Sequence, residues 1–224
     1  MTNARARDDN RPDALPSDLP RIYPITDRRL TGLAHAEQVA RLCEGGARLI
    51  QLREKHLAPR EFYREAADAL RVARSCGARI IINDRADIAL ALGADGLHLG
   101  QDDLRPDAAR RVLGDDAIIG FSTHNAAQAA EAARLPVSYV AVGPVFDTAS
   151  KQNPDPVVGL DTLRRVRSIT EGIPLVAIGG ITHANARAVL AAGADSLAVI
   201  GAVLSQDPAD ITRRMRDLIE LSGV

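Results

Sequence analysis

Aromatic residues are scarce in this 224-residue chain, where Phe, Trp and Tyr together make up 3% of the sequence. The net charge is also close to zero, because 28 Lys and Arg residues are balanced by 29 Asp and Glu residues. A nucleic-acid-binding protein normally carries a basic face and aromatic side chains that stack on bases. The composition therefore argues against a nucleic-acid partner, and any cluster of cations must be local.

Long hydrophobic runs are missing as well, although 46% of the residues are hydrophobic. No segment reaches the roughly 20 consecutive apolar residues that a membrane-spanning helix needs. Residues 1–19 are rich in Arg, Asp, Asn and Pro and contain no apolar stretch, so they predict a disordered tail and not a secretory signal. We therefore expect no membrane partner and a single catalytic domain over residues 20–224.

Cysteine is rare too, since the chain has only Cys43 and Cys76, both in segments with helical periodicity. Disulfide bonds persist mainly in oxidising compartments and in small domains that need them for stability. The two cysteines therefore predict free thiols in a cytoplasmic protein. A homo-oligomer is compatible with the sequence, which does not define the oligomeric state.

Short apolar runs rich in Ile, Val and Leu recur along the chain and are hydrophobic on both faces. This pattern is typical of parallel strands that are buried on both sides of the sheet. The runs span residues 21–26, 48–53, 79–83, 96–99, 118–122, 139–143, 175–179 and 197–201. Segments with helical spacing lie between them, and Gly46, Gly77, Gly93 and Gly193 stand where a helix must end before the next strand.

The regular alternation of eight strands with helices predicts an α/β fold, a (β/α)8 TIM barrel with a parallel sheet. An open doubly wound sheet is the alternative. That fold calls for a glycine-rich phosphate loop after the first strand, but this chain has Thr26-Asp27-Arg28-Arg29 there and no GxGxxG motif at any position.

Polar residues follow the second, third and fourth predicted strands, at the barrel end where catalytic groups lie in this fold. Side chains alternate along an extended segment, so Gln51, Arg53 and Lys55 share one face. Asp84 and Asp103 follow the next two strands. An exposed loop charge is the simple explanation for either acid alone. Together with the cations, however, they predict a Mg²⁺ ion that carries a diphosphate.

Glycines follow the seventh and eighth predicted strands, in Gly179-Gly180 and in Ile200-Gly201. The loops after these two strands commonly form a phosphate site in TIM barrels, because backbone N–H groups there point at the anion. The sequence therefore predicts two phosphorylated groups in one site, a diphosphate near the second to fourth strands and a monophosphate near the last two.

These stretches, in this order, resemble the thiamine-phosphate synthase family, also called thiamine-phosphate pyrophosphorylase. The matching segments are YPITD from residue 23, QLREK from 51, INDRADIALALGADGLHLGQDD from 82, GFSTH from 120, GPVFDTASK from 143, AIGGI from 177 and LAVIGA from 197. The resemblance covers residues 21 to about 205, nearly the whole predicted barrel, and leaves only the amino-terminal tail outside.

The resemblance implies a transferase of thiamine biosynthesis that uses Mg²⁺. It would join hydroxymethylpyrimidine diphosphate to hydroxyethylthiazole phosphate, or to its carboxylated form, and release diphosphate. By motif position, the pyrimidine diphosphate is held by Gln51, Arg53, Lys55 and Asn83, the magnesium by Asp84 and Asp103, and the thiazole phosphate by Gly180, Ile200 and Gly201. Asp102 is the less favoured acid beside Asp103.

The resemblance also places Ser122 beside the pyrimidine and the departing diphosphate, and Thr148, Ser150 and Lys151 on a loop between the two substrates. Arg53, Lys55, Ser122 and Lys151 are the catalytic candidates. The family's reaction is dissociative, so it needs no nucleophilic side chain, and Ser122 has no evident triad in the sequence. Two departures are that the family usually has Thr at position 150 and commonly Ser at position 201.

Two histidines lie near these motifs. His98 sits inside the fourth predicted strand and is expected to be packed and hydrogen-bonded. His124 follows the fifth strand, and its role is left open.

Three other functions are compatible with parts of the pattern. The related thiazole tautomerase is an isomerase on the same barrel, and it should lack the complete set of diphosphate and metal residues. A non-catalytic thiazole-phosphate binding protein would keep the glycines and lose the magnesium acids. A sugar-phosphate epimerase or aldolase fits the fold alone and gives no reason for the diphosphate cluster.

Overall fold

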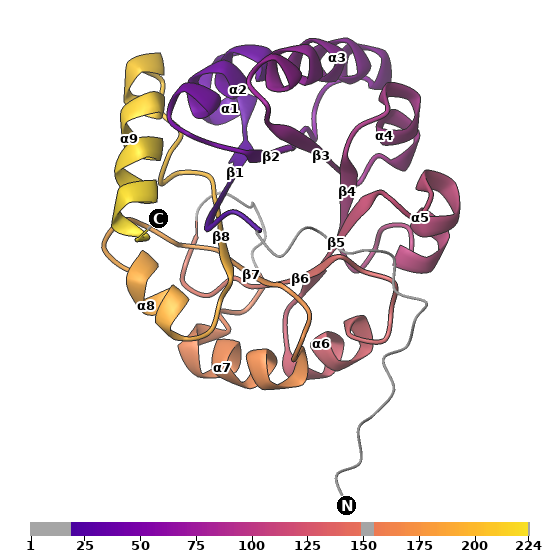
Figure 1. Cartoon of the computed structure of the whole chain (residues 1–224), viewed down its shortest axis with the longest axis vertical. Coiled ribbons are helices and arrows are strands. Elements are labelled where there is room, and N and C mark those ends of the chain that lie inside the picture. The colour runs from indigo at the N-terminus through magenta and orange to yellow at the C-terminus, as the bar shows by residue number, and fades with distance from the viewer. Residues whose placement is uncertain (1–18, 149–154, 224) are drawn as a thin grey trace, which may run out of the picture.

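A computed structural model describes residues 19–148 and 155–223 and shows a closed barrel of eight parallel strands in chain order (Figure 1). The strands are β1 (Ile22–Thr26), β2 (Leu49–Leu52), β3 (Arg79–Asn83), β4 (Gly96–Leu99), β5 (Ile118–Thr123), β6 (Tyr139–Val142), β7 (Leu175–Ile178) and β8 (Ser196–Val199). All eight predicted strands are confirmed, with ends that differ by two residues at most. Of the predicted tail over residues 1–19, residues 1–18 lie outside the described ranges.

Helices surround the barrel on the outside (Figure 1). They are α1 (Arg28–Thr31), α2 (His35–Glu44), α3 (Pro59–Ser75), α4 (Ala86–Leu92), α5 (Pro106–Leu113), α6 (Ala126–Ala132), α7 (Gly159–Ile169), α8 (Ala186–Ala191) and α9 (Pro208–Leu221). The predicted helix ends are also confirmed, because Gly46, Gly77, Gly93 and Gly193 all adopt positive φ angles. The (β/α)8 barrel is therefore the fold, and the open sheet is excluded because β1 pairs with β8.

Helix α3 illustrates how the sequence produces these elements. Pro59 occupies its first turn, where a missing backbone N–H does no harm. Its buried side chains recur at helical spacing and are Phe62, Ala66, Ala69, Leu70 and Ala73. This apolar stripe packs on the barrel, while the charged residues between its members face water.

Side-chain alternation divides each strand between two layers. In β2, Ile50 and Leu52 belong to the layer between strands and helices, whereas Leu49 points into the barrel. The interior cluster consists of Tyr23, Ile25, Leu49, Ile81, Ile118, Tyr139, Ala141, Val176 and Ala198. Because the inward positions continue toward the carboxyl ends of the strands, Gln51 follows Leu49 on the same face.

At the amino-terminal ends of the strands, Arg110 of α5 connects neighbouring segments of the chain. Arg110 is 8% exposed. Its guanidinium donates hydrogen bonds to four backbone carbonyl oxygens, those of Gly114 at 3.1 Å, Asp115 at 2.8 Å, Ala117 at 2.6 Å and Pro136 at 3.2 Å. These carbonyls belong to the segments that lead into β5 and β6. In this fold, that end of the barrel usually serves stability and not catalysis.

None of the helices in the described ranges has the length and hydropathy of a membrane span.

Candidate active site

The acidic pair predicted from sequence comes together at the carboxyl ends of β3 and β4. Asp84 adopts a left-handed backbone with φ of 60°, and its N–H donates to the His98 carbonyl oxygen at 2.9 Å. Asp84 is the one non-glycine residue with a positive φ in the part of the chain that the structure describes. Asp103 accepts a hydrogen bond from the Gly100 N–H at 2.7 Å. Such backbone strain in a non-glycine residue is typical of functional sites.

The Asp84 side chain lies close enough to Asp103 to affect the pKa of the Asp103 carboxyl group. Partial burial raises the pKa of Asp103, and the neighbouring Asp84 carboxylate raises it further, although the Gly100 N–H and Lys55 oppose the shift. Lys55 forms an ion pair with Asp84. Two carboxylates that repel each other beside exposed space favour a bound cation.

The donor set of this pair fits Mg²⁺. Magnesium takes hard oxygen ligands, typically one or two carboxylates plus phosphate oxygens and water. Within residues 19–148 and 155–223, no group of three or more His, Cys, Asp or Glu side chains could hold a metal by itself. A metal at Asp84 and Asp103 would therefore need oxygen atoms from a ligand such as a phosphate.

The loop after β2 carries the predicted phosphate-binding cations Arg53 and Lys55. Glu54 closes this loop, because its Oε1 accepts from the N–H of His56 at 2.6 Å and of Leu57 at 3.2 Å. Arg53 faces Asp27 at 3.8 Å, and its side chain is 25% exposed. The Lys55 side chain is 44% exposed. Both cations therefore lie at the mouth of the barrel, within reach of an anionic ligand.

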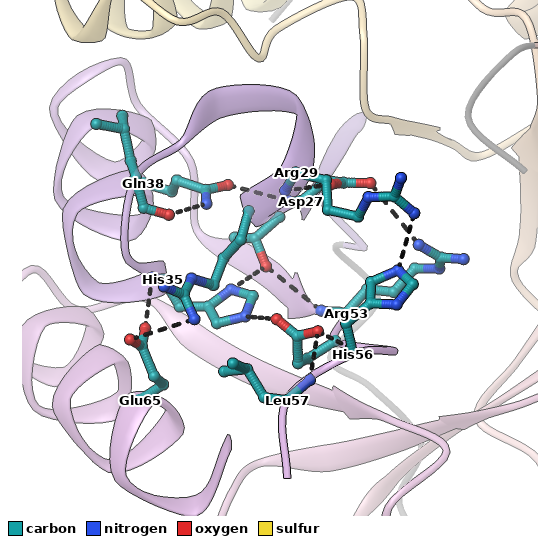
Figure 2. A network of polar contacts seen from close by, with 12 residues as sticks. Asp27, Arg29, His35, Gln38, Arg53, His56, Leu57 and Glu65 are labelled. Carbon is teal, nitrogen blue, oxygen red and sulfur yellow. Dashed lines mark hydrogen bonds and ion pairs between the residues drawn. The ribbon is translucent and has the colours of Figure 1, made fainter. Parts of the chain in front are cut away.

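A buried histidine, His35, lies beside this loop (Figure 2). The Nδ1 atom of His35 lies 2.8 Å from the Thr26 hydroxyl, and that hydroxyl also accepts from the Arg53 N–H at 3.3 Å. The Nε2 atom of His35 lies 3.5 Å from Glu54. Burial lowers the pKa of His35 despite the nearby Glu54 and Glu65 carboxylates, so the ring is neutral near pH 7. Sequence analysis missed this contact, because His35 lies outside every recognised motif.

The barrel interior holds a continuous chain of polar contacts. Gln51 Nε2 donates to the Tyr23 hydroxyl at 3.0 Å, and that hydroxyl lies 3.0 Å from the Tyr139 hydroxyl. The Tyr139 hydroxyl lies 2.9 Å from His98 Nδ1, and His98 Nε2 lies 2.8 Å from Ser122 Oγ. Gln51 and Ser122 are predicted site residues, whereas sequence analysis missed the link through the two tyrosines.

His98 is 8% exposed and hydrogen-bonded through both ring nitrogens, which confirms the expected packed role. Burial lowers its pKa to about 4, although Asp103 opposes the shift. The described residues complete no triad with Ser122, because the Nδ1 atom of His98 faces Tyr139 and not a carboxylate that would orient the ring toward Ser122. The structure places His98 at hydrogen-bond distance from its hydroxyl, on the adjacent strand. Asn83 of β3 pairs with His98 of β4 in the sheet register and is 7% exposed. It therefore lies beside this series of polar contacts, at the end of β3.

The predicted loop between the substrates follows β6. Gly180, just after β7, has a φ of 65°, and a Cβ atom there would lie 2.4 Å from the Asp147 carbonyl oxygen. Glycine is therefore required for this loop to approach the end of β7. Thr148 is half-buried beside it, whereas Ser150 and Lys151 lie outside the described residues.

His124, whose role was open, lies near both ends of this loop. Its Nδ1 atom donates to the Gly143 carbonyl oxygen at 2.7 Å, and its Nε2 atom lies 3.6 Å from Asp155. Gly143 begins the loop, and Asp155 is the first described residue after the gap. His124 therefore contacts the chain at Gly143 and at Asp155, on either side of the residues that the structure does not describe.

Ile200 and Gly201 begin a turn directly after β8. The Ile200 carbonyl oxygen accepts from the N–H of Val203 at 3.1 Å and of Leu204 at 2.9 Å. The first N–H groups of such a turn have no partner within the turn and suit an anion. A Cβ atom at Gly201 would meet nothing within 4 Å, so this position is open.

The predicted residues thus form two groups on the same end of the barrel. The first group, from the ends of β2 to β5, contains Gln51, Arg53, Lys55, Asn83, Asp84, Asp103 and Ser122. The second group, from the ends of β7 and β8, contains Gly180, Ile200 and Gly201. We call them the acidic half and the glycine half of the site.

The chain is similar to proteins of one family over most of its length. A family model described as "Thiamine monophosphate synthase" matches residues 22–203. The chain is 49% identical over 191 residues to a thiamine-phosphate synthase from Koribacter versatilis, covering 83% of this chain and 90% of the relative. It is 42% identical over 205 residues to one from Chloroflexus aurantiacus, covering 91% and 93%.

A solved structure supports the same relationship. The thiamine phosphate pyrophosphorylase from Pyrococcus furiosus is 36% identical to this chain and has a TM-score of 0.79. The alignment covers 90% of this chain and 95% of that structure. Family model, sequence relatives and structure therefore agree, and the chain belongs to the thiamine monophosphate synthase family.

Proposed function

We propose that this chain catalyses the joining of hydroxymethylpyrimidine diphosphate to hydroxyethylthiazole phosphate, or to its carboxylated form, to give thiamine phosphate and diphosphate. The observation that carries the proposal is the pairing of Asp84 with Asp103 beside Lys55, at the same barrel end as the glycine half. This arrangement suits one substrate with a metal-bound diphosphate and another with a monophosphate. Membership of the family supports the same activity.

In this proposal, Asp84 and Asp103 hold Mg²⁺, which neutralises negative charge on the diphosphate when bound. Arg53 and Lys55 lie on the loop above them and bind the remaining phosphate oxygens. As the bond to the pyrimidine methylene breaks, these cations stabilise the charge that grows on the leaving diphosphate. Lys151 is expected to act on the same charge from the loop after β6.

The glycine half of the site holds the thiazole phosphate. Backbone N–H groups near Gly180 and in the turn at Ile200 and Gly201 would bind the thiazole phosphate, with Thr148 and Ser150 between the two substrates. The thiazole nitrogen is itself the nucleophile, so the protein only has to position it. Two free thiols, the buried Cys43 and the exposed Cys76, support a reducing compartment such as the cytoplasm.

The decisive experiment measures diphosphate release by the purified protein with both substrates and Mg²⁺. Release that requires both substrates supports the proposal. If no diphosphate is released when both substrates and Mg²⁺ are present, the proposal is refuted. A thiazole tautomerase would convert its thiazole substrate without any diphosphate, so the two readouts separate these functions.

Two variants test the role of the acidic half. Asp84→Asn should lower the rate at least about 100-fold, because it removes a carboxylate that the proposal assigns to the metal. The variant should stay folded, because asparagine has the same size and tolerates the left-handed backbone at this position. Asp102→Asn is the matched control, since Asp102 is exposed beside Asp103. We expect the control to stay within about twofold of the unmodified protein. Lys151→Ala, a third variant outside the acidic half, should lose most turnover. Equal rates for the two asparagine variants would contradict the assignment of the metal ligands.

A further inference from the structure

The polar chain inside the barrel connects two residues that the proposed function places against substrate. It begins at Gln51 in β2, passes through Tyr23 and Tyr139, and ends through His98 at Ser122 in β5. Gln51, Tyr23, Tyr139 and His98 are all less than a tenth exposed, so bulk water does not compete for most of these contacts. We name this series the interior relay.

The direction of each hydrogen bond follows from the chemistry of the groups. The Gln51 Nε2 atom faces Tyr23 and can only donate, so the Tyr23 oxygen accepts and its proton is directed to Tyr139. Tyr139 accepts this bond and uses its own proton for His98 Nδ1 at 2.9 Å. A neutral histidine that accepts at Nδ1 carries its proton on Nε2.

The last contact of the relay is then defined as well. His98 Nε2–H donates to Ser122 Oγ at 2.8 Å. The serine oxygen is an acceptor in this bond, which leaves its own O–H free to be directed at another group. Ser122 stands at the barrel mouth and is only half-buried, so this group can be part of a substrate.

We propose that the interior relay holds His98 as the neutral Nε2–H tautomer, so that the Ser122 hydroxyl donates a hydrogen bond to the substrate and does not act as a nucleophile. His98 is thus a positioning residue. This inference rests on the proposed function for the identity of the substrate, whereas the tautomer is a property of the protein alone.

The contact between His98 and Ser122 has the distance of a nucleophile and its base, but its polarity is the reverse. In a hydrolase of the serine type, the histidine nitrogen that faces the serine is unprotonated and takes the hydroxyl proton. A protonated Nε2 cannot take that proton. The relay therefore disfavours a serine alkoxide, in agreement with a reaction in which the thiazole nitrogen attacks.

Ring packing keeps the relay in place. The His98 ring stacks on Tyr139 with centroids 5.6 Å apart and an interplanar angle of 17°. Tyr23 meets Tyr139 edge to face, at 5.9 Å and 88°. Gly120 leaves the space for Tyr139, since a Cβ atom there would lie 2.3 Å from the tyrosine hydroxyl oxygen. These contacts hold the donors and acceptors at fixed positions.

The direct test determines the tautomer of His98 by NMR of protein with ¹⁵N-labelled histidine. The chain has five histidines, and the His98 signals are those that disappear in His98→Gln. We expect a protonated Nε2 and an unprotonated Nδ1 at pH 7. A protonated Nδ1 would overturn the proposal, because His98 would then donate to Tyr139 at Nδ1 and accept from the Ser122 hydroxyl at Nε2, which is the reverse of both contacts. This result does not depend on activity, so it stands even if the proposed function fails.

A second test uses the rate of diphosphate release. His98→Leu should lower kcat roughly tenfold, the effect of losing one hydrogen bond. His98→Gln should retain more activity, because its amide can still donate to Ser122. In a Ser122→Ala background, the change His98→Leu should alter kcat less than twofold, since the relay then has no end group to orient. Fully multiplicative effects of the two substitutions would contradict the proposal, with thermal unfolding as the check on folding.

Discussion

Arg110 offers a sharp test of how the barrel is held together at the end opposite the site. Substitution by Met keeps the apolar stem and removes the guanidinium that binds four carbonyl oxygens. The bonds to Asp115 at 2.8 Å and Ala117 at 2.6 Å are the shortest. A net contribution of about 1.5 kcal/mol from each gives a loss of about 3 kcal/mol in the free energy of unfolding. For a chain of this size, the melting temperature should fall by about 6 to 12 °C.

The measurement is urea denaturation and thermal unfolding of Arg110→Met beside Arg111→Met. Arg111 is the matched control, because its side chain is 72% exposed and its ion pair with Asp107 spans 3.5 Å. We expect the control to change the unfolding free energy by less than about 0.5 kcal/mol. Folded Arg110→Met should keep its kcat at room temperature. Equal stability of the two variants, or a large loss of kcat without a loss of stability, would refute this account.

Three further outcomes are expected. Gly120→Ala should destabilise the fold by about 1 to 3 kcal/mol and lower kcat, because the new methyl group would lie 2.1 Å from the Tyr139 ring; an unchanged urea midpoint would contradict this. Burial lowers the pKa of His35 below 6.5, so the unfolded chain takes up the proton first and stability should fall as the pH drops below 6.5, by at most about 1.4 kcal/mol per unit. His35→Gln should flatten the dependence of the urea midpoint on pH in that range, and an unchanged slope would argue against a neutral His35. Gly201→Ser should leave stability unchanged, because the position is open, and should lower KM for the thiazole phosphate only, as initial rates at varied substrate would show.

The elements of the fold could be predicted from sequence because each depends on local patterns. A parallel strand buried on both faces appears as a short apolar run, and a helix that ends in a left-handed glycine leaves Gly-Ala before the next strand. The acidic half could be predicted for the same reason, since Gln51, Arg53 and Lys55 are close in sequence and Asp84 and Asp103 follow consecutive strands.

The interior relay could not be predicted, because it depends on contacts across the barrel. Tyr23 and Tyr139 are 116 positions apart, and either tyrosine alone appears as an ordinary core residue of an apolar strand. Side-chain alternation places both inside, but the stagger of the closed sheet decides which hydroxyl groups meet. The same holds for His35, whose partner Thr26 comes from another element.

The separation of the site into an acidic half and a glycine half has a consequence for how the enzyme can change over time. The acidic half is built by residues 51–122, and the glycine half by residues 180–201. At Gly201, a Cβ atom would meet nothing within 4 Å, so a side chain added there would not displace a neighbour. Substitution in the turn after β8 can therefore alter the affinity for the thiazole phosphate. Asp84 and Asp103, across the barrel, would keep their geometry. Gly201 is then a position at which evolution can adjust the affinity for a single reactant.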